Sequence, residues 1–402
     1  MPKKLIICGG GNSAHTLIPL LADTDFEISI LTSRPELWKH EIKLDYQDTD
    51  GNTLRQFSGH LHKASSNAAE LIPDADYIVL CMPVHKYRSA LLNEIGPFIN
   101  KSKKEVFVGT LYGQGGFNWM VDEMKKRFSI SNVVTFSYGL IPWVCRIVKY
   151  GEKGVTYGCK AVNVAATSPK SYFNQVNEEF FDKICNRWFN TGKTYQSDNF
   201  LSFTLSVDNQ IIHTSRCFGL YKVFGASWKN RKDVPMFYKD YDDISANTLR
   251  DLDNDYTKIR DAIKAIRPDK DYQYMIDYLA LERLSYQSQN TDIRESFVTS
   301  KTLITIDTPV VQNENNEWEL DKNSRFFLDD IYYGNCIAKW IAEKLDIEVP
   351  TIDAIIHWAQ DVREERLIDE NNHLIIDGEL SIFLKSGLPC FYGYDSIDDI
   401  ID

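Results

Sequence analysis

Residues 4–14 read KLIICGGGNSA, and this stretch decides the fold of the first part of the chain. The apolar run before the glycines is typical of a buried parallel strand, and the residues after them have the apolar spacing of a helix. The glycines between them form a G-x-G-x-x-A pattern. Gly9 permits the tight turn, Gly11 lets the backbone approach a pyrophosphate, and Ala14 leaves room for the helix against the strand. The stretch therefore predicts a dinucleotide-binding turn, with a purely structural glycine turn as the alternative.

The helix that follows the glycines offers a binding element at its N-terminus. Asn12 and Ser13 are its first residues, where unpaired N–H groups and the positive end of the helix dipole favour an anion. In NAD-selective folds, an Asp or Glu about 20 residues past the glycines binds the ribose 2′-OH. Here the predicted strand 26–31 ends in Thr32, Ser33 and Arg34, without a carboxylate at its tip. The sequence therefore favours NADP over NAD, unless Arg34 is a solvated surface residue.

Composition narrows the class of protein. The 402 residues carry 45 basic and 57 acidic side chains, a formal net charge of −12, with 43% hydrophobic and 12% aromatic residues. These values predict two globular domains and argue against nucleic acid or an anionic membrane surface as a partner. No apolar run approaches the ~18 residues of a membrane span, and the N-terminal stretch is too short for a signal peptide. The eight cysteines show no CxxC pair and no metal-ligand spacing, so we expect reduced thiols, no bound metal and a cytoplasmic protein.

The distribution of strand and helix patterns divides the chain in two. Short Ile- and Val-rich runs first alternate with helix-length segments, as in βαβ units; they lie at 4–8, 26–31, 77–81, 106–108 and 133–136, with two further strands at 154–157 and 161–165 that should extend the sheet. From about Asn199, helical periodicity dominates. We therefore predict an α/β Rossmann-type domain with a parallel-rich sheet over residues 1–198. An all-helical substrate domain should follow over 199–402, with a cleft between the two as the default substrate site.

Helices of the second domain follow from its apolar spacing. They are expected at 244–265, 272–287, 326–345 and 351–366, preceded by one long helix that contains Leu201, Leu205, Ile212, Leu220 and Val223. Thr308-Pro309 and the polar run 312–317 indicate a loop between helices.

Three stretches resemble the octopine dehydrogenase family of opine dehydrogenases: CGGGNSAHTL at 8–17, LIPWVCRI at 140–147 and HWAQ at 357–360. The resemblance continues to the FYGY segment at 391–394, in the same order and at similar spacing. It implies a Rossmann-type domain followed by an all-helical opine dehydrogenase domain. It also implies NAD(P)H-dependent condensation of an amino acid's amine with a 2-oxo acid, usually pyruvate. We expect these small molecules as the partners of a monomer or homodimer.

Asn209 and His213 lie four residues apart on the predicted long helix and therefore on one face. Imidazole suits the chemistry, because condensation needs a proton donor to the carbonyl oxygen near neutral pH. A lone helical His is otherwise more often a core or surface residue. The resemblance implies that His213 is the catalytic residue at the nicotinamide, and we expect Asn209 to contact substrate.

The stretch 324–330 resembles the family's arginine followed five residues on by an aspartate. The match implies that Asp330 holds the ring of His213, with Asp329 as the competitor for that role. Arg325 would clamp a substrate carboxylate, because its planar fork suits two parallel hydrogen bonds. The alternative is a helix N-terminal Asp and a surface Arg.

Further candidates lie in the first domain. Gln114 stands in a glycine loop after the strand 106–108, where we expect it to touch cofactor or substrate. Pro83 should shape the chain beside the nicotinamide. Trp143 and Cys145 should line the substrate side, although both residue types are also common in plain cores.

Amino-acid specificity does not transfer from the resemblance. An ungapped count places Tyr278 where the octopine-forming member has a tryptophan, and the local match is poor. Two other functions compete: a dehydrogenase for a 2-hydroxy acid or sugar phosphate, and a non-catalytic nucleotide-sensing protein. A phosphate site needs clustered cations, but only Arg216 and Lys222 follow His213 on its helix. The joint presence of the His, Arg and Asp with the glycine turn argues against the sensor.

Overall fold

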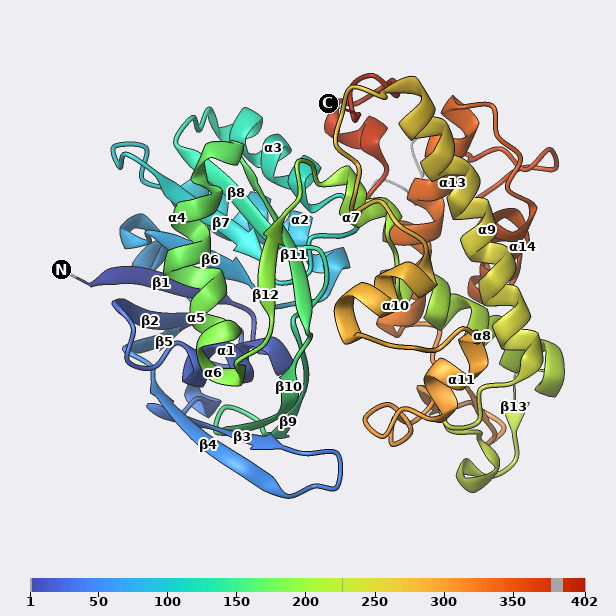
Figure 1. Cartoon of the computed structure of the whole chain (residues 1–402), viewed down its shortest axis with the longest axis horizontal. Helices are drawn as coiled ribbons and strands as arrows, with labels where there is room; N and C mark the ends of the chain where they lie inside the picture. Colours follow the sequence, from blue (N-terminus) through green and yellow to red (C-terminus); the bar gives the residue numbers. More distant parts are fainter. Residues whose placement is uncertain (1, 226, 377–385, 402) are drawn as a thin grey trace. The chain divides into compact units, whose positions relative to one another are not determined.

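The computed structural model describes residues 2–225, 227–376 and 386–401. The chain divides into two compact units, Met1–Phe200 and Leu201–Asp402 (Figure 1). Unit 1 is a mixed α/β domain built on a largely parallel sheet, and unit 2 is mainly helical. The predicted order, an α/β domain with a parallel-rich sheet followed by a helical domain, is confirmed. Unit 1 carries the glycine turn, and unit 2 carries His213 and Asp330.

The main sheet of unit 1 has the strand order of a dinucleotide-binding fold. Across the sheet the strands are β12 (Lys193–Gln196), β11 (Val162–Ser168), β8 (Val133–Tyr138), β7 (Val106–Thr110), β6 (Tyr77–Leu80), β1 (Lys3–Cys8), β2 (Phe26–Leu31) and β5 (Lys63–Ser65). From β5 to β8 all pairs are parallel, and β11 joins antiparallel to β8. The chain order reverses between β1 and β6, which is where such sheets bind nucleotides. These central strands are buried on both faces, so their apolar runs were readable in the sequence.

A second sheet corrects one expectation. Its strands lie in the order β4 (Thr53–His60), β3 (Glu41–Gln47), β10 (Lys153–Cys159) and β9 (Trp143–Lys149). The strand predicted at 154–157 therefore belongs to this sheet and does not extend the main one, whereas the strand predicted at 161–165 does. The sequence analysis missed β3, β4 and β9. Six of the eight residues of β4 are exposed, so the strand lacks the apolar run that marks a buried one.

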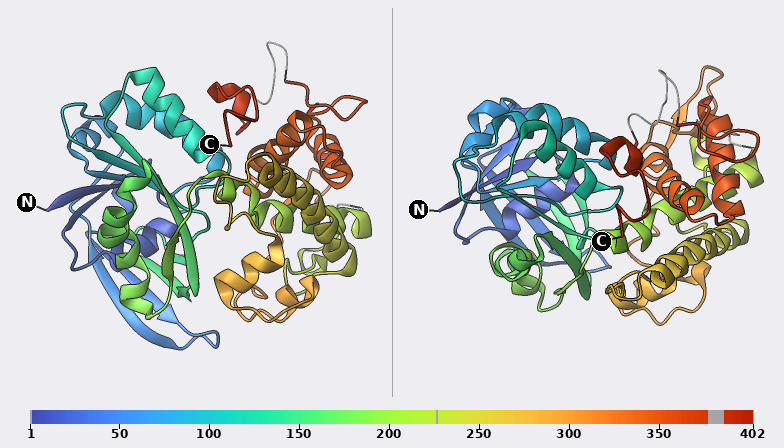
Figure 2. Two further views of the ribbon diagram at one scale, coloured as in Figure 1. Left: turned by 45° about the horizontal axis from the view of Figure 1, so that its top comes forward. Right: turned by 90° about the horizontal axis from the view of Figure 1, so that it is seen from above.

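Helices cover the main sheet on both faces. Helix α1 (Asn12–Leu20) contacts all four strands of the second sheet, so that sheet packs around the helix that begins at the glycine turn. The second view of Figure 2 shows the main sheet between α3 (Phe117–Phe128) and the segment from α4 (Phe173–Val176) to α6 (Asn186–Phe189). The core that joins these layers is rich in aromatic side chains, with Tyr77, Phe107, Phe136, Phe180 and Phe181 in mutual contact.

Unit 2 is a set of packed helices with a small sheet. The helices are α7 (Leu201–Leu205), α8 (Asn209–Phe224), α9 (Asp243–Ile266), α10 (Tyr278–Tyr286), α11 (Ile293–Val298), α12 (Arg325–Leu328), α13 (Cys336–Lys344) and α14 (Pro350–Arg363). Helix α8 packs against α9, α12 and α14. Its residues Gln210–Cys217 are all buried, so the helix has no solvent-exposed face over this stretch. His213 stands in the middle of it.

Three expectations for this unit are corrected. The single long helix predicted from Leu201 is two helices, because Asp208 caps a new start at Asn209. The helix predicted at 326–345 is α12, a π-helical turn at Ile331–Asn335 and α13 in succession. The unit is also not all-helical: the polar run 312–317 lies in a hairpin, part of a sheet of β13 (Ser227–Trp228), β15 (Trp318–Leu320) and β14 (Val310–Gln312).

One buried carboxylate fastens α14 to α9. Asp255 is 2% exposed, and its Oδ2 accepts hydrogen bonds from the N–H groups of Thr351 (2.7 Å) and Ile352 (3.2 Å) at the start of α14. Asp255→Ala should leave these donors unpaired and lower the free energy of unfolding by about 1–3 kcal/mol. Asp251→Ala, exposed on the same helix, should change it by less than about 0.5 kcal/mol. Urea unfolding checks both, and equal midpoints for the two variants would contradict the capping role.

Candidate functional site

The glycine turn lies at the point where the strand order reverses. Gly9 follows β1 with a φ of +103°, and a Cβ there would stand 2.6 Å from the carbonyl oxygen of Cys81, which follows β6. Both the positive φ and the close approach exclude a side chain. The turn therefore fits the narrow space between the carboxyl ends of β1 and β6, the position of a nucleotide in folds of this order.

The N-terminus of α1 is built to accept an anion. Gly11 is its N-cap and contributes no capping side chain, and the first turn contains no acidic residue. Asn12 Oδ1 accepts a hydrogen bond of 2.9 Å from the N–H of Ile147, which joins the turn to β9. The N–H groups and the dipole at this helix end therefore fit a pyrophosphate. Ser13 and Ala14 occupy the same first turn, as predicted.

Two hydrogen bonds fix the imidazole of His15, next to the glycine turn, in a single protonation state. Its Nδ1 lies 2.9 Å from the Gly11 carbonyl oxygen, to which it donates, and its Nε2 accepts a 2.7 Å hydrogen bond from the N–H of Gly151. Only the neutral Nδ1–H tautomer makes both bonds. Burial lowers the pKa of His15, consistent with this assignment. Its role is structural, within an aromatic group with Trp38 and Tyr150.

The end of β2 carries a cation but no carboxylate. Thr32 is buried and donates its N–H to the Ser65 carbonyl at 2.9 Å, which continues the β2–β5 pairing. The Arg34 guanidinium lies 4.1 Å from the centre of the Tyr150 ring. Pro83 follows β6 in extended conformation and begins the turn beyond it.

Three predicted substrate contacts of unit 1 are buried. Gln114 accepts a 3.0 Å hydrogen bond from the Tyr112 hydroxyl at its Oε1. Trp143 lies in the hydrophobic core, and its indole donates to the Ile184 carbonyl at 3.0 Å. Burial raises the pKa of the Cys145 thiol, which keeps it protonated. Their contact with substrate stays a prediction.

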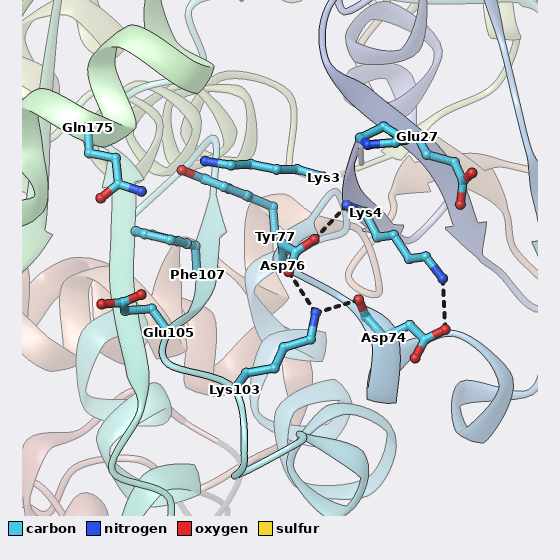
Figure 3. A pocket seen from close by; sticks show the side chains of 11 residues that line it. Lys3, Lys4, Glu27, Asp74, Asp76, Tyr77, Lys103, Glu105, Phe107 and Gln175 are labelled. Atoms are coloured by element: carbon cyan, nitrogen blue, oxygen red, sulfur yellow. Dashed lines mark hydrogen bonds and ion pairs between the residues drawn. The ribbon is translucent and has the colours of Figure 1, made fainter.

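The cavity in Figure 3 lies at the opposite ends of the strands from the glycine turn. It has a volume of about 590 Å³ and is lined by residues at the starts of β1, β2, β6 and β7. Its charges pair with each other: Lys4 with Asp74 at 2.8 Å, and Lys103 with Asp76 at 2.6 Å. Parallel sheets bind ligands at the carboxyl ends of their strands, so this cavity is not a candidate substrate site.

In unit 2, His213 and Asp330 form a buried hydrogen-bonded pair. His213 Nδ1 lies 2.7 Å from Asp330 Oδ2, although the residues are 117 positions apart in the chain. The two side chains are 1% and 4% exposed. Asp330, directly before the π-helical turn, is the carboxylate in contact with the ring. Asn209 begins α8 one turn before His213, as its spacing predicted.

Aromatic side chains enclose the His213 ring. Phe326 stacks on it with the ring centres 3.8 Å apart, and Phe237 meets it edge-on at 5.6 Å. The Tyr238 hydroxyl lies 3.2 Å from His213 Nε2. The sequence reading missed all three, because no motif spacing joins them to His213; the fold alone brings them together.

Burial and one cation set the charge state of the pair. Burial lowers the pKa of His213 well below its usual value, and the charge of Arg325 lowers it further. Burial raises the pKa of Asp330, and Arg325 opposes this rise. Arg325 itself is exposed at the start of α12, with its guanidinium 5.4 Å from the centre of the Phe326 ring. Because Nδ1 faces the Asp330 carboxylate, Nε2 is the nitrogen that can exchange a proton, which is the arrangement of a general acid–base.

Asn335 fastens the segments that carry this pair. Its amide donates to the carbonyl of Gln210 on α8 at 3.2 Å and to that of Asp330 at 3.0 Å. Fixing both segments to one side chain keeps the His213–Asp330 distance short.

The described residues form neither a metal-ligand cluster nor a membrane-spanning helix. No cluster of three or more His, Cys, Asp or Glu side chains suited to a metal ion occurs in the described part of the chain. Across the same residues, no helix is long and apolar enough to span a bilayer.

The strand order and the glycine turn are those of a dinucleotide-binding domain. Residues 196–363 match the family model "NAD/NADP octopine/nopaline dehydrogenase, alpha-helical domain". Octopine dehydrogenase of Pecten maximus is 24% identical over 426 residues, covering 100% of this chain and 99% of the relative. Opine dehydrogenase of Haliotis discus hannai is 24% identical over 385 residues, covering 90% of each.

A solved octopine dehydrogenase with NADH and L-arginine has the same fold. Its TM-score is 0.79 at 22% identity, and the match covers 99% of this chain and 98% of that one. The family model over the helical unit and the curated relatives bear out the resemblance to the octopine dehydrogenase family that the sequence motifs indicated. The protein is an NAD(P)-dependent oxidoreductase of the class that acts on CH–NH donors.

Removing the charge of Arg325 should raise the pKa of His213, because that charge disfavours the imidazolium. Arg325→Gln should therefore move the His213 titration upward, towards the usual value. Arg250→Gln on α9, an exposed arginine elsewhere in the unit, should leave it unchanged. The measurement is a pH titration of protein labelled with ¹⁵N-histidine, with His213→Gln to assign the signal. A downward shift in Arg325→Gln would contradict the assigned electrostatics.

Proposed function

We propose that the protein is an opine dehydrogenase that joins the amine of an amino acid to carbon 2 of a 2-oxo acid such as pyruvate. The observation that carries this proposal is the buried His213–Asp330 hydrogen bond within the unit that matches the family's helical domain. The overall change consumes the amine, the 2-oxo acid, one proton and one NAD(P)H. It yields the secondary amine, NAD(P)⁺ and water.

The glycine turn is the proposed nucleotide site. Its residues, with the end of β2 and the residue after β6, would hold the pyrophosphate, the ribose and the nicotinamide edge: Gly9, Gly11, Asn12, Ser13, Ala14, Thr32, Arg34 and Pro83. When bound, the reduced nicotinamide supplies the hydride that carbon 2 receives.

Unit 2 supplies the acid and the anion clamp. Arg325 is exposed and charged, and its fork would hold the carboxylate of the 2-oxo acid. His213 would deliver its Nε2 proton to the oxygen that leaves as water, while Asp330 fixes the ring through Nδ1. Asn209, Gln114, Trp143 and Cys145 are proposed as further substrate contacts.

The mass of the reaction product tests the proposed function. Purified protein is supplied with NADPH or NADH, pyruvate and a panel of amino acids, each component being omitted in turn, and the product is analysed by mass spectrometry. We expect a mass equal to amino acid plus pyruvate, less water, plus two hydrogens. His213→Gln should lower kcat by about 10²–10⁴ while nucleotide binding is retained. Lactate formed at the same rate without any amine would instead indicate a 2-hydroxy-acid dehydrogenase.

We infer that NADPH is preferred over NADH. The support is the end of β2, where Thr32, Ser33 and Arg34 provide a cation and no carboxylate that would repel a 2′-phosphate. Arg34→Ala should weaken NADPH binding more than NADH binding in a fluorescence titration. The matched control is Glu36→Ala, which removes the next carboxylate along the chain. A selective loss of NADH binding in Glu36→Ala would show that Glu36 binds the ribose and that NAD is the natural cofactor.

A further inference from the structure

The nitrogen of His213 that does not face Asp330 is covered by a phenol. Tyr238 Oη lies 3.2 Å from His213 Nε2, and the two residues are 6% and 1% exposed. Phe326 covers one face of the imidazole ring. Because Nδ1 is bonded to Asp330, Nε2 is the nitrogen at which a proton is exchanged, and the hydroxyl of Tyr238 is the group that such a proton meets first.

A buried arginine holds Tyr238 in this position. Arg216 follows His213 by three residues on α8, and its side chain is 0% exposed. Its guanidinium donates to the carbonyls of Phe237 (2.9 Å) and Met236 (3.1 Å) and to the Asp242 carboxylate (2.6 Å). These contacts fix the backbone immediately before Tyr238 and the chain after it. Burying a guanidinium is costly unless its donors are satisfied, so these contacts constrain the segment strongly.

We propose that Tyr238 relays the proton between His213 and the substrate oxygen. This inference rests on the proposed function, because it takes the leaving oxygen of that reaction as the acceptor. The phenol O–H gives its proton to that oxygen while the imidazolium Nε2–H gives its proton to the phenol oxygen. Tyr238 thus ends as it began, His213 becomes neutral, and the Asp330 carboxylate keeps its hydrogen bond to Nδ1–H.

The contact serves both protonation states of His213. When the imidazole is neutral, the phenol donates to Nε2; when it is protonated, Nε2–H donates to the phenol oxygen, and the phenol hydrogen can turn to the substrate. The second arrangement is charge-assisted and the stronger of the two, so the contact favours the imidazolium and opposes the effect of burial on the pKa of His213. Other charged and titratable groups that act on the pair come from several elements: Asp208, which caps α8, Cys217 of α8, Tyr256 of α9, Arg325 of α12, and Asp329 beside Asp330.

Tyr238→Phe removes the hydroxyl and keeps the ring. The matched control is Tyr241→Phe in the same segment, because the buried Tyr241 hydroxyl bonds the Ser215 hydroxyl at 2.9 Å and not His213. Urea unfolding of both variants establishes that each is folded. We expect Tyr238→Phe to lower kcat by about 10²-fold, with KM for the 2-oxo acid changed less than about threefold. The control should stay within about twofold of the native kcat.

The pKa of His213 is the second readout, and it does not depend on turnover. In the ¹⁵N-histidine titration, Tyr238→Phe should lower it by roughly half a pH unit to one pH unit, because the charge-assisted hydrogen bond of the imidazolium is lost. The control should not move it. An unchanged kcat in Tyr238→Phe, or a loss confined to KM, overturns the relay. An unchanged pKa of His213 overturns the contact. If the native protein turns over no amine with any 2-oxo acid, the proposed function fails, while the titration still tests the contact.

Discussion

The hydrogen bond between His213 and Asp330 is the constraint on which the helical unit depends. Two ionisable side chains are taken out of water 117 residues apart in the chain, and they stay together only if both backbones are held. Side-chain hydrogen bonds to backbone carbonyls near the pair hold these segments in place. The Asn335 amide joins α8 to the segment of Asp330, and Arg216 joins α8 to the segment of Phe237. The rest of the unit surrounds this frame.

The π-helical turn belongs to the segment that carries Asp330 and Asn335. The helical segment from α12 to α13 is continuous in the sequence pattern, but its middle widens at Ile331–Asn335, directly after Asp330. An insertion of this kind rotates the side chains on one side of it relative to those on the other, and such turns are frequent at functional sites. A regular helix would keep Arg325, Asp330 and Asn335 on the strict 3.6-residue period.

The sequence predicted the elements whose backbone conformation or burial requires a particular type of residue. Gly9 is required by its positive φ and by the Cys81 carbonyl oxygen, which would lie 2.6 Å from a Cβ at this position, so the residue type itself indicates the turn. The central strands are buried on both faces and read as apolar runs. The edge strand β4 has no such apolar run, since most of its residues are exposed. The break between α7 and α8 lies within an apolar run, where periodicity continues and only the Asp208 cap marks the new start. Tyr238 is one of 21 tyrosines, and nothing in its neighbours distinguishes it before the chain folds.

Arg325 connects the charge of the site to its proposed substrate. In the free protein its cation helps to keep the imidazole of His213 neutral, although the proposed reaction needs the protonated ring. When Arg325 binds the 2-oxo acid as proposed, the substrate carboxylate would neutralise that cation. The imidazolium would then be disfavoured by burial alone, and the adjacent Asp330 carboxylate would stabilise it. Substrate binding would thus raise the proton affinity of His213 at the moment the proton is needed. The same arginine that orients the substrate would therefore prevent the free site from carrying a buried positive charge.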